Sequence, residues 1–281
     1  MTAPPPPAGD TCPSCGAARP GQHCPDCGER RIDPARDHSL RWLFGHVLDG
    51  WLQLDGKLLR ALRALLFAPG RLTRDHLDGR RVPYLPPLHL FLTTGVVFYL
   101  FFQNAYAAPI DSLQQNYDNG SWIGNVFRCD FGPLLAHKAE ALHGGIDVVK
   151  AQITVRAAQE SKVFLGALVP VFALWLQLLY WRRQPRFVPH FVTGVHFLTA
   201  FLLIDMLFLT IMRLLDHTSV SDLQFLPLFA VFLVHVVVAL RRIHREPWPL
   251  AAAKGIAFVA GCVVAIVIYR QAVTITVARL L

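Results

Sequence analysis

Five apolar runs constrain the fold of this chain more than any other feature. They cover about residues 88–107, 163–181, 190–212, 223–240 and 251–271. A run of about 20 apolar residues is long enough to cross the bilayer core as a helix, and a helix satisfies its backbone hydrogen bonds internally where no water is present. We therefore expect an all-α polytopic membrane protein with about five transmembrane helices.

The composition agrees with this expectation. Only 16% of the residues are charged and 53% are hydrophobic, whereas soluble domains carry about 25% charged residues. The net charge of +8 would favour a nucleic-acid-binding function in a soluble protein. Most of the positive excess lies in the N-terminal third and in two short loops, so membrane topology explains it better than a nucleic-acid ligand.

Arginine clusters predict the orientation, because short loops rich in Lys and Arg stay in the cytosol. A basic junction, residues 69–87, precedes the first apolar run. The loops after the second and fourth runs are also basic, whereas the long excursion 110–161 and the loop between the third and fourth runs are not. This alternation places the N-terminus in the cytosol and the excursion and the C-terminus outside. The basic residues expected at the membrane surface of the junction are Arg71, Arg74, Arg80 and Arg81.

Two C-P-x-C-G motifs lie close together in residues 12–31. Each C-x-x-C turn can direct two thiolates at one tetrahedral ion, and two such turns complete a closed site of the structural zinc class. The predicted Zn²⁺ ligands are Cys12, Cys15, Cys24 and Cys27. A pair of disulfides is the alternative, but the cytosol keeps thiols reduced. We predict a small zinc ribbon after a disordered N-terminus, residues 1–11.

Residues 39–67 show helical periodicity of apolar positions with a break near Asp55-Gly56. Arg60 and Arg63 lie beside the apolar face. The pattern is typical of an amphipathic linker helix that lies on the inner leaflet. A helical pair packed against the protein's own cytosolic side is the alternative.

The ribbon and the junction together resemble a known family. The matching residues are G-Q-H-C-P-D-C-G-E-R at 21–30, Pro69-Gly70, and D-G-R-R-V-P-Y-L-P-P-L at 78–88. They resemble a bacterial family of inner-membrane proteins that is catalogued as a domain of unknown function, whose members carry a zinc-ribbon-like motif and a G-K/R-R-x-x-Y-x-P-P junction. Such ribbons often read C-G-Q where this chain has Glu29. The resemblance covers about the first third of the chain and implies a multi-pass protein of the bacterial inner membrane, but no reaction.

Polar residues inside the apolar runs are the other candidates for function, because ionisable groups are costly in a membrane. Four such residues form a candidate intramembrane polar cluster: Gln177, His196, Asp205 and His235. The competing interpretation is that each makes an interhelical hydrogen bond, worth about 0.6 kcal/mol.

Two functions follow from these features. The first is a binding or scaffold protein whose ribbon tethers a cytosolic protein partner at the membrane, with nucleic acid as a disfavoured ligand and a homo-oligomer as an option. The second is a transporter of a small solute or ion that uses His196, Asp205 and His235. The sequence shows no phosphate-binding glycine loop and no H-E-x-x-H or G-x-S-x-G motif, so we do not expect an enzyme.

Overall fold

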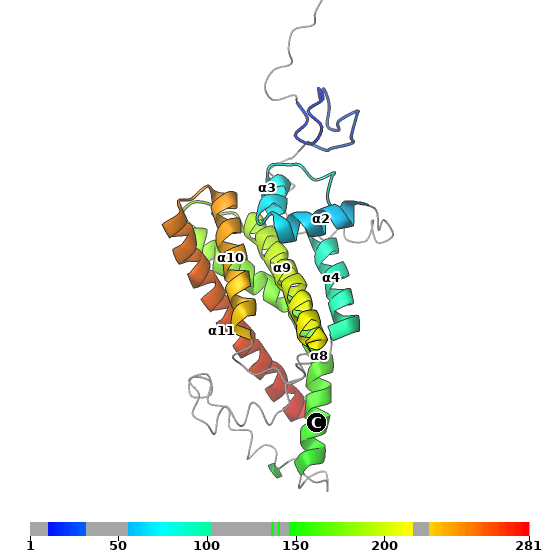
Figure 1. The fold of residues 1–281 in the computed structure, drawn as a ribbon, viewed down its shortest axis with the longest axis vertical. Helices are drawn as coiled ribbons and strands as arrows, with labels where there is room; N and C mark the ends of the chain where they lie inside the picture. Colours follow the sequence, from blue (N-terminus) through cyan, green and yellow to red (C-terminus); the bar gives the residue numbers. More distant parts are fainter. Residues whose placement is uncertain are drawn as a thin grey trace, which may run out of the picture. The chain divides into compact units, whose positions relative to one another are not determined.

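The computed structural model describes residues 11–31, 56–102, 136–137, 140, 146–215 and 225–280. The predicted disordered N-terminus (apart from Thr11), residues 39–55 of the linker, and residues 110–135, 138–139 and 141–145 of the excursion lie outside these residues. In chain order the main helices are α2 (Gly56–Phe67), α3 (Arg71–Leu77), α4 (Pro87–Phe102), α8 (Ile146–Tyr180), α9 (Phe187–Leu214), α10 (Phe225–His244) and α11 (Trp248–Leu280) (Figure 1).

The helices confirm the predicted all-α membrane protein. Three segments are long and apolar enough to cross a bilayer, namely Phe187–Leu214, Leu226–His244 and Trp248–Ile266. Two shorter apolar helices, Pro87–Phe102 and Gly166–Tyr180, fall on the two remaining apolar runs. Within the described residues, β-structure is limited to two isolated bridges in the N-terminal segment.

The chain divides into two compact units. The first holds Met1–Val96 and Phe172–Val259, and the second holds Val97–Val171 and Ala260–Leu281. α8 is one continuous helix of 35 residues with Pro170 inside it, so the second apolar run continues a helix that begins within the excursion. The first unit contains every candidate site discussed below.

α9 forms the centre of the first unit, where it contacts α2, α3 and α10. Aromatic rings join it to its neighbours: Phe197 lies 5.3 Å from Phe258 of α11, and Phe201 lies 5.1 Å from Phe232 of α10, measured between ring centroids. Van der Waals packing of this kind holds helices together in lipid, where the hydrophobic effect between helices is absent.

α2 packs one face against the protein itself. Its buried Ala61 and Leu65 form a cluster with Leu72 of α3, Leu90 of α4 and Ala200 of α9. Part of its opposite face stays exposed: Leu59 and Phe67 are 72% and 81% accessible. The packed face agrees with the alternative interpretation for α2, and contact of the linker with the inner leaflet stays a prediction.

Candidate metal centre and its junction

The four cysteines of the N-terminal segment lie together. Their sulfur atoms are all within 4.8 Å of one another, and the Cys12–Cys27 and Cys15–Cys24 Sγ pairs are each 3.5 Å apart. None of the four is in a disulfide. The predicted cluster is therefore confirmed as a group of thiols that can hold a metal ion.

Two equivalent turns build the cluster. In the first, the Gly16 N–H donates to the Cys12 carbonyl at 2.8 Å, and in the second the Gly28 N–H donates to the Cys24 carbonyl at 2.9 Å. Both glycines have positive φ, 80° and 74°, a conformation that costs a residue with a Cβ about 1–2 kcal/mol. The glycine after each C-x-x-C is thus required for the turn that directs both thiols inward.

The donor set fits zinc. Four thiolates bound tetrahedrally at about 2.3 Å place their sulfur atoms about 3.8 Å apart, close to the spacing observed. Burial raises the pKa of the Cys12 thiol, but hydrogen bonds from the backbone of Cys15 and Ser14 and from neighbouring thiols outweigh it and bring that pKa to about 7. A metal ligand must lose its proton, so these amides favour the form that binds a metal.

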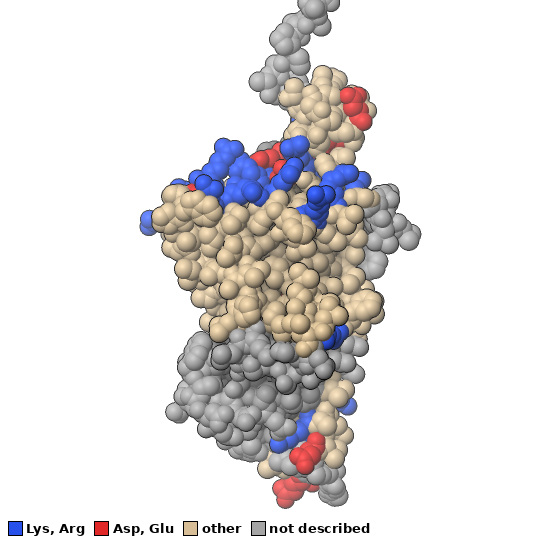
Figure 2. All heavy atoms as spheres, viewed as in Figure 1, with Lys and Arg blue, Asp and Glu red and all other residues tan. Residues whose placement is uncertain are grey.

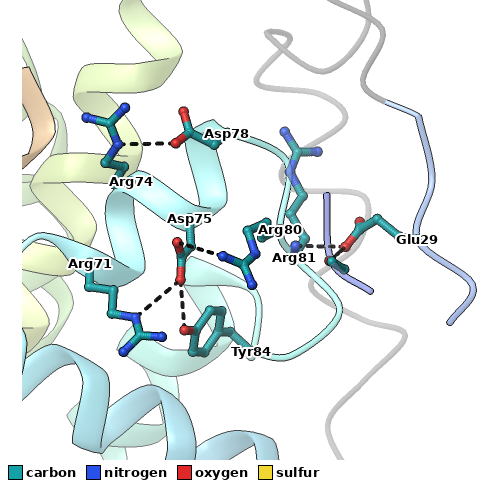
Figure 3. A network of polar contacts seen from close by, with 9 residues as sticks. Glu29, Arg71, Arg74, Asp75, Asp78, Arg80, Arg81 and Tyr84 are labelled. Atoms are coloured by element: carbon teal, nitrogen blue, oxygen red, sulfur yellow. Dashed lines mark hydrogen bonds and ion pairs between the residues drawn. The ribbon is translucent and has the colours of Figure 1, made fainter. Parts of the chain in front are cut away.

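Glu29 attaches the cysteine turns to the basic junction. Its Oε2 accepts hydrogen bonds from the backbone N–H groups of Arg81 and Val82 at 2.9 and 3.0 Å (Figure 3). The same oxygen accepts the Ser14 hydroxyl at 2.5 Å, and the residue is 3% exposed. A buried carboxylate with charge-assisted partners makes a strong contact, which fixes the metal-binding segment to the junction.

A second carboxylate, Asp75, organises the rest of the junction (Figure 3). It accepts the Tyr84 hydroxyl at 2.9 Å and forms ion pairs with Arg71 at 3.7 Å and Arg80 at 4.0 Å. Burial and the hydrogen bond to Asp75 raise the pKa of Tyr84. Two residues of the D-G-R-R-V-P-Y segment, Arg80 and Tyr84, therefore have a structural role around one helix, α3.

α3 is held firmly against α10. Gly70, which precedes it, has φ of 76°, and a Cβ there would lie 2.7 Å from the Ala239 carbonyl oxygen. Arg74 Nη1 donates to the Arg242 carbonyl at 3.0 Å, and Arg242 Nη1 donates in return to the Pro69 carbonyl at 2.7 Å. Reciprocal bonds across a glycine contact fix the relative position of the two helices.

The polar residues of the apolar runs have separate surroundings. Gln177 donates to the Pro185 carbonyl at 3.1 Å in the loop after α8. His196 Nδ1 lies 2.9 Å from the Thr73 hydroxyl of α3, and Asp205 and His235 are buried in α9 and α10. The hydrogen bonds of Gln177 and His196 therefore lead to different partners, and the intramembrane polar cluster stays a prediction.

Sequence reasoning missed several residues with clear roles. Glu29 stood out only as a departure from C-G-Q, Asp75 and Thr73 belong to no motif, and Glu246 lies among arginines without a pattern of its own. Glu246 has a fully buried side chain and accepts from the Tyr180 hydroxyl at 3.1 Å, Arg183 Nη1 at 2.9 Å and Lys254 Nζ at 2.6 Å. A lone acidic residue in a loop of three arginines was the available signal for it.

Fold and site together define a helical membrane protein with a thiol cluster attached to a basic junction. The family model described as "Protein of unknown function (DUF3667)" matches residues 55–99. This confirms the resemblance to a family catalogued as a domain of unknown function, and the match covers α2, α3 and most of α4 but not the cysteines. No curated protein and no solved structure matches the chain.

Proposed function

We propose that this protein is a zinc-dependent docking protein of the bacterial inner membrane, whose ribbon recruits a cytosolic protein partner. The observation that carries the proposal is the attachment of a closed four-cysteine cluster to the junction through Glu29. Four protein thiolates leave no open coordination position, which is typical of a structural zinc site and not of a catalytic one. The proposal includes no catalytic step.

Zinc supplies folding free energy in this arrangement. A segment of about 20 residues buries too little apolar surface to fold alone, so the metal has to join the two turns. Glu29 then holds the folded ribbon at a fixed place on the junction, beside the helices. A rigid, metal-stabilised surface next to the bilayer is suited to binding a partner, because the surface does not have to become ordered when the partner binds.

The basic residues support a cytosolic ribbon. Lys and Arg gather at the α3 end of the first unit (Figure 2). The residues include Arg71, Arg80, Arg182, Arg186, Arg241 and Arg245, all exposed. Positive residues at one end of a helical bundle favour the cytosolic side, and the ribbon is attached at that end through Glu29.

The test is crosslinking in native membranes followed by mass spectrometry, with zinc content measured on the purified protein. The Cys12→Ser/Cys15→Ser variant should lose bound zinc and the crosslinked partner. Cys262→Ser is the control, because this thiol is buried in α11 and is not one of the four clustered cysteines. Zinc that remains in the double variant contradicts the metal assignment, and identical neighbours in both proteins contradict the docking function.

Transport is a second candidate, favoured by one observation. Nε2 of His196 and Nε2 of His235 are buried and have no hydrogen-bond partner within the described part of the chain. Unsatisfied polar atoms at membrane depth often mark a path for an ion or a proton. This candidate expects His196→Ala, His235→Ala or Asp205→Asn to abolish a flux across proteoliposomes while assembly persists. Unchanged flux in all three variants eliminates it.

A further inference from the structure

A hollow lined by arginines lies between α3 and the turn that joins α10 to α11. Its volume is about 440 Å³, and its walls are Arg74, Arg241, Arg242, Arg245 and Glu246. One wall comes from residue 74 and the others from residues 241–246, so the fold brings two distant segments together here. Sites for small ligands commonly have volumes of about 300–1,000 Å³, and this hollow falls within that range.

The negative charge in the hollow is already neutralised. The Glu246 carboxylate receives hydrogen bonds from Tyr180, Arg183 and Lys254, and its side chain is fully buried. Arg183 and Lys254, which do not line the hollow, therefore compensate the charge of Glu246. The four arginines that face the hollow keep a net positive field, apart from the Arg74–Asp78 ion pair at 3.2 Å.

The backbone and neighbouring side chains orient these arginines in advance. Arg74 and Arg242 are fixed by hydrogen bonds to the carbonyls of Arg242 and Pro69. The Arg241 guanidinium stacks over Trp248, 4.4 Å from the ring centroid. Pre-oriented guanidinium groups lose less entropy when they bind a ligand.

Arg245, which directly follows the last residue of α10, is the exception among the four arginines. It has φ of 53°, a left-handed conformation that is unfavourable for a side chain with a Cβ. Among the described residues it has no hydrogen-bond or ion-pair partner. The turn therefore accepts backbone strain and presents a guanidinium that is free to bind.

We propose that this arginine hollow binds a phosphate-bearing anion at the membrane surface. Guanidinium groups form paired, charge-assisted hydrogen bonds with phosphate oxygens, and an anion in the hollow would be attracted by the three arginines that have no carboxylate partner in the described part of the chain, Arg241, Arg242 and Arg245. The phosphate belongs either to an anionic phospholipid head group or to a soluble phosphate compound. This proposal does not rest on the docking function, because none of the residues that line the hollow belongs to the cysteine segment.

The general excess of positive charge at this end of the helices is the competing explanation, and matched variants separate the two. Arg241→Gln/Arg245→Gln removes two charges from the hollow without removing the Arg74–Arg242 bonds. Arg182→Gln/Arg186→Gln removes two exposed charges from the loop between α8 and α9, whose residues do not line the hollow. Both full-length variants are first shown to keep the wild-type elution volume and thermal midpoint.

Binding is measured on full-length protein in two arms. In the first, native mass spectrometry follows retention of phosphatidylglycerol added to protein in neutral detergent, against phosphatidylcholine. In the second, calorimetry follows inorganic phosphate added to protein in phosphatidylcholine nanodiscs. Arg241→Gln/Arg245→Gln should lower the affinity for the bound phosphate probe by about tenfold or more, the size expected for charge-assisted hydrogen bonds. Arg182→Gln/Arg186→Gln should lower it by less than about twofold.

The two arms identify the source of the phosphate. Selective retention of phosphatidylglycerol supports a lipid head group, and selective binding of inorganic phosphate supports a soluble ligand. Equal loss in both variants overturns the proposal, and so does a protein that retains phosphatidylglycerol no better than phosphatidylcholine and binds no inorganic phosphate.

Discussion

Glu29 shows how one side chain determines a contact that no motif encodes. Its single oxygen Oε2 serves two backbone N–H groups of the junction and one hydroxyl of the ribbon. Gln, the residue that ribbons of this kind often carry, can accept the same amides only through a neutral oxygen. Hydrogen bonds to ionised groups are roughly twice as strong as neutral ones, so the acidic residue strengthens the attachment.

Substitution of Glu29 should release the junction without removing the metal. We expect hydrogen exchange at the Arg81 and Val82 amides to accelerate by about tenfold or more in Glu29→Ala, the effect of losing a buried charged acceptor, and by less in Glu29→Gln. Zinc content should stay at the wild-type level in both, because Glu29 is not a ligand. Unchanged exchange in the Ala variant contradicts the contact.

His76 gives the first unit a dependence on pH. Burial, the nearby Arg81 guanidinium and His196 hold the pKa of His76 well below its usual range, whereas the unfolded chain has a pKa of about 6.5. Below about pH 6.5 the unfolded state therefore binds a proton that the folded state does not. The free energy of unfolding therefore falls as the pH drops below about 6.5. Above that pH, His76 is neutral in both states and causes no such loss.

The measurement is the thermal midpoint of the detergent-solubilised protein between pH 7.5 and 5. Wild type should lose stability as the pH falls, by up to about 1.4 kcal/mol per pH unit from this one group. His76→Gln should show a shallower decline even if its midpoint at pH 7.5 is lower. Parallel pH profiles for the two proteins rule out His76 as the titrating group.

Among the secondary-structure elements, α3 depends on a close approach that only glycine permits. The Gly70 Cα faces the backbone of Ala239, and its φ is positive. Gly70→Ala should lower stability by about 1–3 kcal/mol, through backbone strain and displacement of α10. Gly21→Ala is the control, because no atom lies within 4 Å of its Cβ position and no positive φ is recorded there. Equal thermal midpoints for the two variants contradict the role of this contact.

The sequence predicts the helices better than their contacts. Residues 190–212 form a long apolar run, and in lipid a single apolar segment satisfies its backbone hydrogen bonds by forming a helix. α9 covers this run. The contact of Thr73 with His196 joins residues 123 positions apart, and no periodicity reports such a pairing. The predicted group of four cysteines is confirmed, because the two cysteines of each turn lie within one short segment, where local spacing carries the information.

At the scale of the whole molecule, the arginine loops and the ribbon predict one topology. A reporter fused after α11 should lie outside the cytosol, because five spans place the two ends on opposite sides. Alkaline phosphatase fused there should be active and green fluorescent protein should be dark, whereas fusions in the loop that contains Arg182 should show the reverse. Fluorescent fusions at both positions contradict the threading.

The attachment of the ribbon through Glu29 has a consequence for thermodynamic linkage. Its main-chain carbonyl accepts the Cys24 N–H and closes the second cysteine turn, while its side chain holds the junction amides. Two binding events coupled through one element change each other's affinity by the same factor. A ligand that fixes the junction in this arrangement should therefore raise the affinity of the cysteine cluster for a metal ion. Loss of the metal should lower the affinity for that ligand by the same factor.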